Sequence, residues 1–497
     1  MDKNEALKQY HEWQDKQKAY ALALQTMGFD RLTIAPKDGV EYYAKQYAYL
    51  AGELFSIATD PKICELLTGL SRQDLAEADR RSVQLDLREF ERWNRIPKQE
   101  FVDFTEAQNL SEAKWEEAKA KNDYSIFEPH LQRMIGYTKK FAHYRDPQKD
   151  AYDLLLGDYE EGMDQKQYDE FFRGIRENLL PLIHEVAAHQ ERVSDACLHG
   201  EWPVPQQELV MKHLQEYLGF DPAWGYMGVS VHPFTDGLSH GDVRVTTAYQ
   251  TDHVESAVFS IIHEVGHAIF EHDINPQFHG TVLGNVTSGL HESQSRLFEN
   301  YLGRSQAFWR CNYPFLQQTF PDNLKNVSCE EFVRAVNVSR PSLVRTEADE
   351  LTYPIHILIR YEMEKEIFKG DADLSHLDVL WNQKMKEYLG VDVPDDAHGI
   401  LQDTHWSDAS FGYFPTYALG SAYAAQFYEA MKQELDVDAL LAEGGFAQIS
   451  AWLREHVHQD GALHTPKEVV QRATGKPFDP SIYIQYLSRK YRTLYQL

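Results

Sequence analysis

The chain has no long apolar run. Its uninterrupted apolar stretches are short, such as Ala-Val-Phe at 257–259, and no window approaches the ~20 apolar residues that a membrane-spanning helix requires. The opening residues, MDKNEALKQYHEW, contain no apolar segment of the kind that a signal peptide has. We therefore expect a protein that has no membrane as a partner.

Cysteine is also scarce. Only four cysteines occur in 497 residues, they lie far apart and none forms a CxxC pair: Cys64, Cys197, Cys311 and Cys329. Proteins held together by disulfides are much richer in cysteine, so that class is excluded. A few separate cysteines in a long chain are typical of free thiols in a reducing compartment, and we expect a cytoplasmic protein.

Positive charge is in short supply as well. The chain has 49 Lys and Arg against 77 Asp and Glu, which gives a formal net charge of −28. Nucleic-acid binding depends on clustered Lys and Arg side chains, so we expect no nucleic-acid partner. Hydrophobic residues make up 43% of the chain, which is typical of a folded globular protein and excludes a disordered one.

Most of the chain has apolar residues at the three-to-four-residue spacing of helices, and this predicts a mainly α protein. No Gly/Ser linker, low-complexity tract or internal repeat interrupts the pattern. We predict a single domain over residues 1–497. It would have a helical N-terminal part to about residue 225 and a part from about residue 226 that carries the functional motifs.

One segment has a different pattern. Residues 228–234 and 243–247 alternate between apolar and polar side chains, and Thr235, Asp236 and Gly237 between them are common in turns. Two short alternating runs around a turn predict a small β ribbon within the helical protein.

Residues 263–267 read His-Glu-Val-Gly-His, which is the HExxH pattern. Side chains four positions apart share one face of a helix, so His263 and His267 can bind the same zinc ion. Glu264 then lies beside the open position of the metal, where it can take a proton from the activated water.

The residues around this pattern predict a largely buried helix. Asp252 and Glu255 have the spacing of a capping box at its start, and Pro276 is expected to end it. Burying two imidazoles in such a helix costs free energy unless they are ligated or hydrogen-bonded, which favours a metal site.

The site needs a third protein ligand. The extended pattern with a third histidine is absent, because Phe270 and Asp273 occupy its Gly and His positions. His272 and His279 lie nearby, but surface positions are more common for such residues. A carboxylate from a second helix can complete the site instead, and the candidates are Glu292 and its rival Glu299, between which spacing alone does not decide.

The sequence resembles the Taq-like, or thermostable-type, zinc metallocarboxypeptidases, and the resemblance is dense from about residue 228 to the C-terminus. The matching segments are HPF at 232–234, DVRVTT at 242–247, HEVGH at 263–267, HESQS at 291–295, ADELTYPIH at 348–356, LQDTHW at 401–406 and GYFPTY at 412–417. Several motifs in this order are far more specific than HExxH alone. The resemblance favours Glu292 over Glu299 as the third ligand.

This resemblance implies a two-lobed helical fold with a deep active-site groove, similar to angiotensin-converting enzyme and neurolysin. It implies a homodimer that removes single residues from peptide C-termini with broad specificity. One Zn²⁺ per chain would be bound, and Co²⁺ could substitute for it. The expected partners are therefore peptides with a free C-terminus and a second copy of the chain.

Neurolysin-type enzymes place a His and a Tyr over the metal from one loop, and the similar loop here spans residues 405–417. We expect Tyr417 to donate a hydrogen bond to the oxyanion that forms during hydrolysis, with His405 beside it. Tyr413 is the alternative donor. By analogy with angiotensin-converting enzyme, His232 would contact the substrate backbone.

A carboxypeptidase must also bind a terminal carboxylate, and arginine does so best because its guanidinium group forms two parallel hydrogen bonds. The candidates are Arg345, which we favour, Arg360 and Arg244.

Two other functions compete with the carboxypeptidase hypothesis. An endo-oligopeptidase would share the fold and the metal chemistry, whereas a catalytically silent peptide-binding protein would have no need of an intact HExxH, glutamate and His/Tyr loop together.

Overall fold

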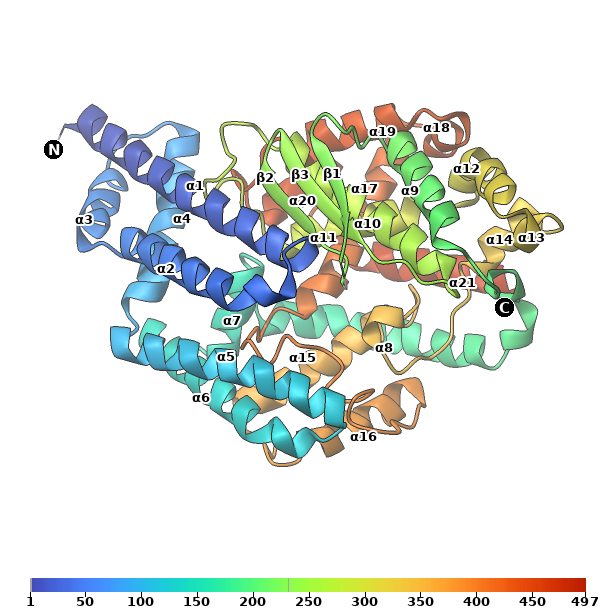
Figure 1. The fold of residues 1–497 in the computed structure, drawn as a ribbon, viewed down its shortest axis with the longest axis horizontal. Coiled ribbons are helices and arrows are strands. Elements are labelled where there is room, and N and C mark those ends of the chain that lie inside the picture. Colours follow the sequence, from blue (N-terminus) through green and yellow to red (C-terminus); the bar gives the residue numbers. More distant parts are fainter. Residues whose placement is uncertain (1, 231) are drawn as a thin grey trace.

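The structure, a computed structural model, describes residues 2–230 and 232–497. It is mainly helical and contains one small sheet, as predicted (Figure 1). In the described residues, no helix is both long enough and apolar enough to cross a membrane.

The N-terminal half consists of helices. Their bounds are α1 (Lys3–Thr33), α2 (Val40–Ala58), α3 (Pro61–Leu70), α4 (Glu77–Asn94), α5 (Lys98–Lys121), α6 (Glu128–Arg145), α7 (Ala151–Tyr159), α8 (Gln165–Ala187) and α9 (Val204–Leu218). Three of them, α1, α3 and α4, enclose a small apolar core of their own, which includes Tyr10, Trp13 and Leu67. The main core begins in α4 at Leu85 and continues to the C-terminal helix. The prediction of one domain whose N-terminal part ends near residue 225 stays a prediction.

The sheet has three strands, β1 (Gly225–Val229), β2 (Thr235–Ser239) and β3 (Asp242–Thr247), in the order β1-β3-β2. Strands β2 and β3 form an antiparallel hairpin, and β1 pairs with β3 in parallel. A small β structure exists where it was predicted, but of the described residues in the predicted run 228–234 only Gly228 and Val229 lie in a strand, and the predicted turn was wrong. Thr235, Asp236 and Gly237 belong to β2, and the chain reverses at His240 and Gly241 instead, where the hairpin needs only two residues.

The C-terminal half is again helical. Its longer helices are α10 (Val254–Asp273), α11 (Ser288–Arg296), α12 (Gln306–Thr319), α15 (Tyr353–Lys369), α16 (Leu377–Leu389), α17 (Pro415–Glu434), α20 (Pro466–Thr474) and α21 (Ser481–Tyr495). The shorter ones are α13 (Pro321–Leu324), α14 (Cys329–Ala335), α18 (Val437–Glu443) and α19 (Phe446–Leu453). A π-helical segment, η5 (Leu297–Leu302), continues α11 directly.

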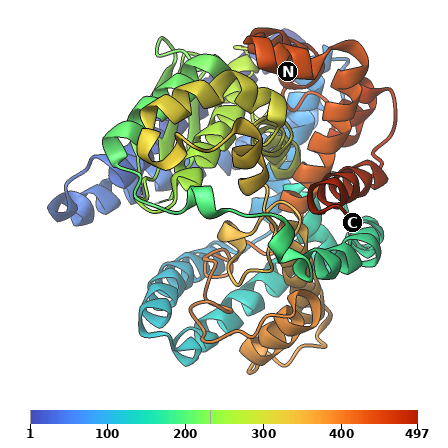
Figure 2. The same ribbon diagram turned by 90° about the vertical axis from the view of Figure 1, so that its right-hand side faces the viewer.

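These elements form two parts. Helices α5, α6 and α16 lie on one side of the molecule, and the sheet with α9, α10 and α12 lies on the other (Figures 1 and 2). Helix α17 packs against both α11 and α15 and so links the two parts through the middle of the molecule.

Candidate metal centre

The HExxH residues lie on α10, as predicted, and α11 packs against that helix. The close approach depends on Gly266, because a Cβ there would lie 2.8 Å from the carbonyl oxygen of Gln294 in α11. Gly420 has the same function between α17 and α11, since its Cβ would lie 2.8 Å from the Cβ of Glu292. Two glycines therefore let three helices meet at one glutamate.

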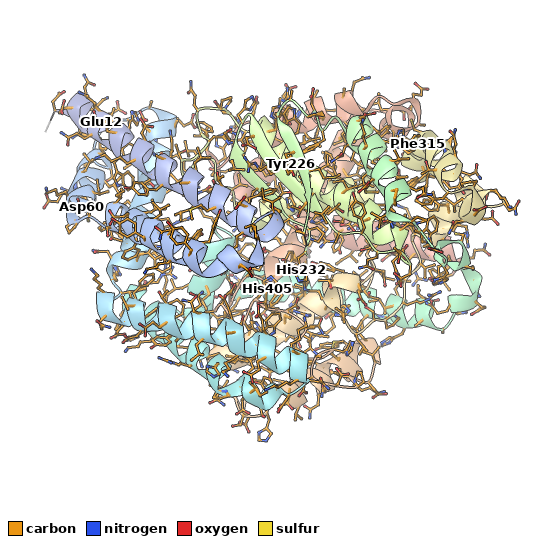
Figure 3. All side chains as sticks on the ribbon, viewed as in Figure 1. Glu12, Asp60, Tyr226, His232, Phe315 and His405 are labelled. Carbon is orange, nitrogen blue, oxygen red and sulfur yellow. The ribbon has the colours of Figure 1, made fainter. Side chains whose placement is uncertain are left out.

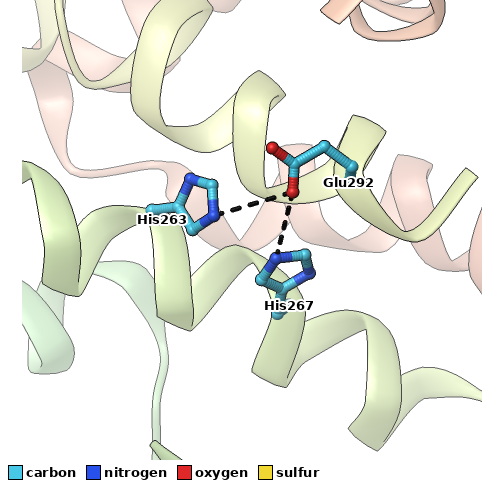
Figure 4. Close-up of side chains that lie close together, drawn as sticks. All are labelled: His263, His267 and Glu292. Atoms are coloured by element: carbon cyan, nitrogen blue, oxygen red, sulfur yellow. Dashed lines mark ion pairs between the residues drawn. The ribbon is translucent and has the colours of Figure 1, made fainter. Parts of the chain in front are cut away.

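This packing brings together three side chains with metal-ligating atoms (Figure 4). The ring nitrogens and carboxylate oxygen of His263, His267 and Glu292 lie within 4.8 Å of one another. The Oε2 atom of Glu292 is 3.7 Å from Nε2 of His263 and 3.5 Å from Nε2 of His267. Two imidazoles and one carboxylate are the ligand set of many catalytic zinc sites, and they leave a position for water or substrate.

The rival ligand Glu299 lies behind the site. Its Oε2 atom is 2.9 Å from Nδ1 of His263, on the far side of the ring from Glu292. Arg296, between the two glutamates along the chain, donates from Nε to Oε1 of Glu292 and from a terminal nitrogen to Glu299, at 2.7 and 3.1 Å. Glu299 is therefore placed to orient a ligand, and Arg296 leaves Oε2 of Glu292 facing the histidines.

His267 is supported differently. Its Nδ1 is 2.6 Å from Nδ1 of His291, and Nε2 of His291 is 2.7 Å from Oε1 of Glu271. Burial, reinforced by the neighbouring His291, lowers the pKa of His267 to about 3. The ring is therefore neutral at ordinary pH, which is the form in which histidine binds a metal.

Charge stabilises the ionised form of Glu292, the third candidate ligand. Burial opposes the negative charge of Glu292, but Arg296 together with His263 and His267 outweighs it and holds the pKa of Glu292 well below its usual range. The carboxylate is thus ionised at neutral pH, as a metal ligand must be.

The expected general base faces the same space. Glu264 is buried, and the hydroxyl of Thr235 at the start of β2 donates a 2.6 Å hydrogen bond to its Oε2 atom. Burial raises the pKa of Glu264, so its carboxylate is a stronger base than an exposed glutamate.

A cavity of about 380 Å³ opens onto these residues. Its other walls come from β2 and the residues before it, from the start of α11 and the residue Val286 before it, and from the start of α17 and the loop before it. The lining residues on these segments include Pro233, Phe234, Thr235, Val286, Ser288, Tyr413, Thr416 and Tyr417. A larger cavity, of about 780 Å³, lies between α8 and α20 and contains none of the predicted site residues. The side chains of His263, Glu264 and His267 thus face the smaller of the two cavities.

The aromatic loop, which we define as residues 403–414, lies opposite the metal ligands. Tyr413 at its end and Tyr417 in the first turn of α17 both line the cavity. His405 is not among the described lining residues. It lies behind the tyrosines, with its ring stacked on that of Tyr413 at 5.3 Å and its Nε2 atom 3.5 Å from the Tyr417 hydroxyl.

Two of the predicted arginines lie together next to this loop. Arg345 and Arg360 are both buried, and both form ion pairs with Asp403. The guanidinium of Arg345 also lies 5.0 Å from the ring centre of Tyr417. Arg345 is therefore adjacent to the cavity wall, and Arg360 lies deeper, bonded to Asp403 and Gln402.

The other two predicted substrate contacts are on the sheet side. Arg244, on β3, forms a two-point ion pair with Asp242 and lies over the ring of Phe29. His232 is exposed, and it directly precedes Pro233 and Phe234 of the cavity wall. Figure 3 shows His232 and His405 toward the middle of the molecule. The roles assigned to all of these residues stay predictions.

Sequence reasoning missed several residues around the centre. His291 and Asp403 lie in the matching HESQS and LQDTHW segments but were given no role, and Thr235 was assigned to a turn. Arg296 carries no pattern of its own, although its place four residues after Glu292 and three before Glu299 allows contact with both on one helix face.

Comparison with known proteins agrees with this geometry. The family described as carboxypeptidase Taq (M32) metallopeptidase matches residues 9–491. Carboxypeptidase 1 of Bacillus subtilis (strain 168) is 42% identical over 483 residues, which are 96% of each chain. Thermostable carboxypeptidase 1 of Thermus thermophilus is 36% identical over 496 residues, 97% of each chain. The crystal structure of an M32 carboxypeptidase from Deinococcus radiodurans R1 superposes with a TM-score of 0.95 at 33% identity, over 99% of this chain and 100% of that one. The chain therefore belongs to the carboxypeptidase Taq (M32) family of metallopeptidases.

Proposed function

We propose that this metallocarboxypeptidase releases single amino acids from peptide C-termini with broad specificity, holds Zn²⁺ on three side chains and uses Glu264 as its general base. The observation that carries the proposal is the convergence of His263, His267 and Glu292 with Glu264 on one cavity. The described lining residues of that cavity include no lysine or arginine that would select an acidic side chain, which supports broad specificity.

The donor set fits a zinc ion. Each histidine has its Nδ1 atom bonded to a neighbour and its Nε2 atom directed toward Glu292, so the ligating atoms face one point. Two imidazole nitrogens with one carboxylate oxygen are typical of catalytic zinc sites, and Co²⁺ suits the same set. Metal analysis of the purified protein tests this: about one zinc per chain is expected, and a different dominant metal would overturn it.

A bound divalent ion supplies Lewis-acid chemistry, which polarises the carbonyl of the scissile bond and lowers the pKa of a water molecule. Glu264 accepts the proton of the attacking water as its oxygen bonds to the carbonyl carbon. The same carboxylic acid then protonates the leaving nitrogen as the C–N bond breaks. The Thr235 hydroxyl holds Oε2 of Glu264 during both transfers.

The negative charge that develops on the carbonyl oxygen needs a donor. Burial raises the pKa of Tyr417 well above its usual value, so its phenol is protonated and can donate. Burial, with Arg345 next in effect, lowers the pKa of His405 to about 4, so this ring is neutral at ordinary pH and orients the phenol without adding charge. We retain Tyr413 as the alternative donor.

Charge around Asp403 supports Arg345 as the group that binds the substrate carboxylate. Among the described residues, Asp403 is the one carboxylate paired with Arg345 and Arg360, which leaves one positive charge uncompensated. A buried excess charge is costly, and an incoming carboxylate would neutralise it. The position of Arg345 beside Tyr417 places that charge next to the cavity.

The decisive experiment uses one peptide in two forms, as the free acid and as the C-terminal amide. Mass spectrometry should show products that lose one residue at a time from the free acid only, and a chelator should stop the reaction. Internal cuts in both forms would instead indicate an oligopeptidase. Absence of cleavage after Zn²⁺ or Co²⁺ is restored would indicate a peptide-binding protein.

We also propose that the protein is a homodimer in the cytoplasm. The family resemblance suggests the dimer, and six large apolar side chains exposed on or just after α1 and α2 support a contact surface: Leu22, Leu32, Ile34, Tyr42, Tyr47 and Tyr49. Four free cysteines support a reducing compartment. Light scattering on the purified protein should give twice the mass of 57.6 kDa, and a monomer would refute the dimer.

A further inference from the structure

A buried glutamate outside the cavity is attached to the aromatic loop at two points. Glu364, on α15, has no exposed surface. Its Oε1 atom accepts a 2.7 Å hydrogen bond from the indole nitrogen of Trp406, and its Oε2 atom accepts one of 2.7 Å from the backbone nitrogen of Gly412. The hydroxyl of Tyr152 on α7 is 3.0 Å from Oε2 as well.

The two attachment points flank the residues that face the site. Trp406 directly follows His405, and Gly412 directly precedes Tyr413, so the carboxylate holds the loop next to each member of the stacked His405–Tyr413 pair. We propose that Glu364 is a positioning residue for peptide hydrolysis, because it fixes the separation of Trp406 and Gly412 and thereby the placement of that pair. This inference rests on the function proposed above for the aromatic loop.

The loop has no room to take another path at these points. Gly412 adopts a φ of 88°, and a Cβ there would lie 2.8 Å from the carbonyl carbon of Leu155 in α7. Trp406 is buried, with its ring edge-on to Trp381. A change in the hydrogen bonds of Glu364 would therefore be transmitted to His405 and Tyr413 rather than absorbed by empty space.

The bonding pattern requires a carboxyl group in particular. An indole N–H and a backbone N–H can only donate, and they address different oxygens of Glu364. A carboxylate accepts from both, and so does the carboxylic acid when its own O–H points to Tyr152. An amide has only one accepting oxygen, so glutamine at this position would place its NH₂ group against one of the two donors.

The test is Glu364→Gln in the full-length, metal-loaded protein, assayed on a peptide with a free C-terminus. We expect kcat to fall by about 100-fold, the effect typical of a displaced catalytic group, with KM changed much less. Zinc content and zinc affinity should equal those of the wild type, because the metal ligands lie on α10 and α11. Tyr152→Phe is the matched control: it removes the third partner and leaves both loop donors in place, so kcat should stay within about threefold.

A rescue separates positioning from a general loss of structure. Replacing Trp406 by Phe in the Glu364→Gln background removes one donor, so the amide oxygen can serve Gly412 without a clash, and kcat should recover about tenfold. Trp406→Phe alone keeps the carboxylate and should lower kcat by about tenfold; it serves as the second test if Glu364→Gln does not fold. An unchanged kcat in either single variant, a lost metal ion or the lack of rescue would overturn the proposal.

A last variant distinguishes failure of this inference from failure of the proposed function. If Glu364 acts through the loop, Glu364→Gln should cost much less in a Tyr413→Phe, His405→Ala background than in the wild type. A full, additive cost in that background would overturn the positioning role while leaving the loop chemistry intact. If Tyr417→Phe, Tyr413→Phe and His405→Ala each leave kcat unchanged, it is the proposed function of the loop that fails.

Discussion

The two sides of the active site are held in place in different ways. On the metal side, α10, α11 and η5 supply both the ligands and most of the groups that orient them, all within residues 263–299. On the side of the aromatic loop, the neighbours of His405 and Tyr413, which are Trp406 and Gly412, are held by Glu364 from a distant part of the chain. The metal side is thus organised by neighbouring segments of the chain, whereas the loop side is organised by contacts between distant segments.

This difference predicts two kinds of defect. Changes on the metal side should lower metal affinity, because they remove or misdirect a ligand. Changes on the loop side should lower kcat and leave the metal in place. Glu264 should behave differently from its neighbours, because it lies on the metal side and yet is not expected to bind the metal.

Removal of the third ligand should give the largest effect. Glu292→Ala takes away the only carboxylate that faces Nε2 of both histidines among the described residues, and the protein should lose its metal and all measurable activity. Metal analysis after dialysis and a titration with Zn²⁺ measure the loss. Glu299→Ala should weaken binding by only about 10–100-fold, because Glu299 orients His263 from behind. If the Glu292→Ala variant still bound a full equivalent of metal, the third ligand would be Glu299 instead.

Glu264→Gln should come next. The amide oxygen can still accept the hydrogen bond from Thr235, so the local structure is retained, but the side chain can no longer take a proton. A general base contributes about 10²–10⁴-fold, and kcat should fall by that factor with the zinc content unchanged. Turnover near that of the wild type would show that another group is the base.

The metal side could be predicted from the sequence better than the loop side, because its residues lie close together in the chain. His263, Glu264 and His267 share a short pattern whose helical spacing already implies the geometry, and the third ligand was narrowed to two glutamates before the family resemblance favoured Glu292. The partners of the aromatic loop could not be found in this way. Glu364 lies 42 residues before Trp406, no local sequence pattern links the two, and only the packing of α15 beneath the loop brings them together.

Local details of the fold were also only partly predictable. The capping box expected at Asp252 and Glu255 was wrong: α10 begins at Val254, because the Asp252 carboxylate pairs with the ring of His253 instead of capping the helix. The predicted end near Pro276 is confirmed, since α10 ends at Asp273. Helix caps depend on which neighbour a short side chain bonds, and sequence spacing does not fix that choice.

Tyr417→Phe tests the loop side. Removal of one donor to an oxyanion costs about 10²–10³-fold, so kcat should fall by that factor while KM changes little and zinc stays bound. Tyr413→Phe is the matched control, because it removes the same hydroxyl from a neighbouring tyrosine that lines the same cavity. A larger loss of kcat in Tyr413→Phe than in Tyr417→Phe would show that Tyr413 is the donor to the oxyanion.

The smallest effect should come from the support of His267. When Nε2 of His267 ligates the metal, its Nδ1 carries the proton and donates to Nδ1 of His291, whose own proton is then on Nε2 and is donated to Glu271. His291→Phe removes this acceptor and should weaken zinc binding by about 10–100-fold, as Glu299→Ala should on the other histidine.

Glu271→Gln provides the control for this last prediction. Its amide oxygen can still accept from Nε2 of His291, so zinc affinity should stay within about threefold of the wild-type value. Competition with a chromogenic chelator measures both variants in the same titration. Equal losses in Glu271→Gln and His291→Phe would mean that the charge of Glu271, rather than the direction of the hydrogen bonds, supports His267. The two histidine ligands would then be held alike, each by a nearby negative charge, and the metal side would depend on electrostatics more than on proton placement.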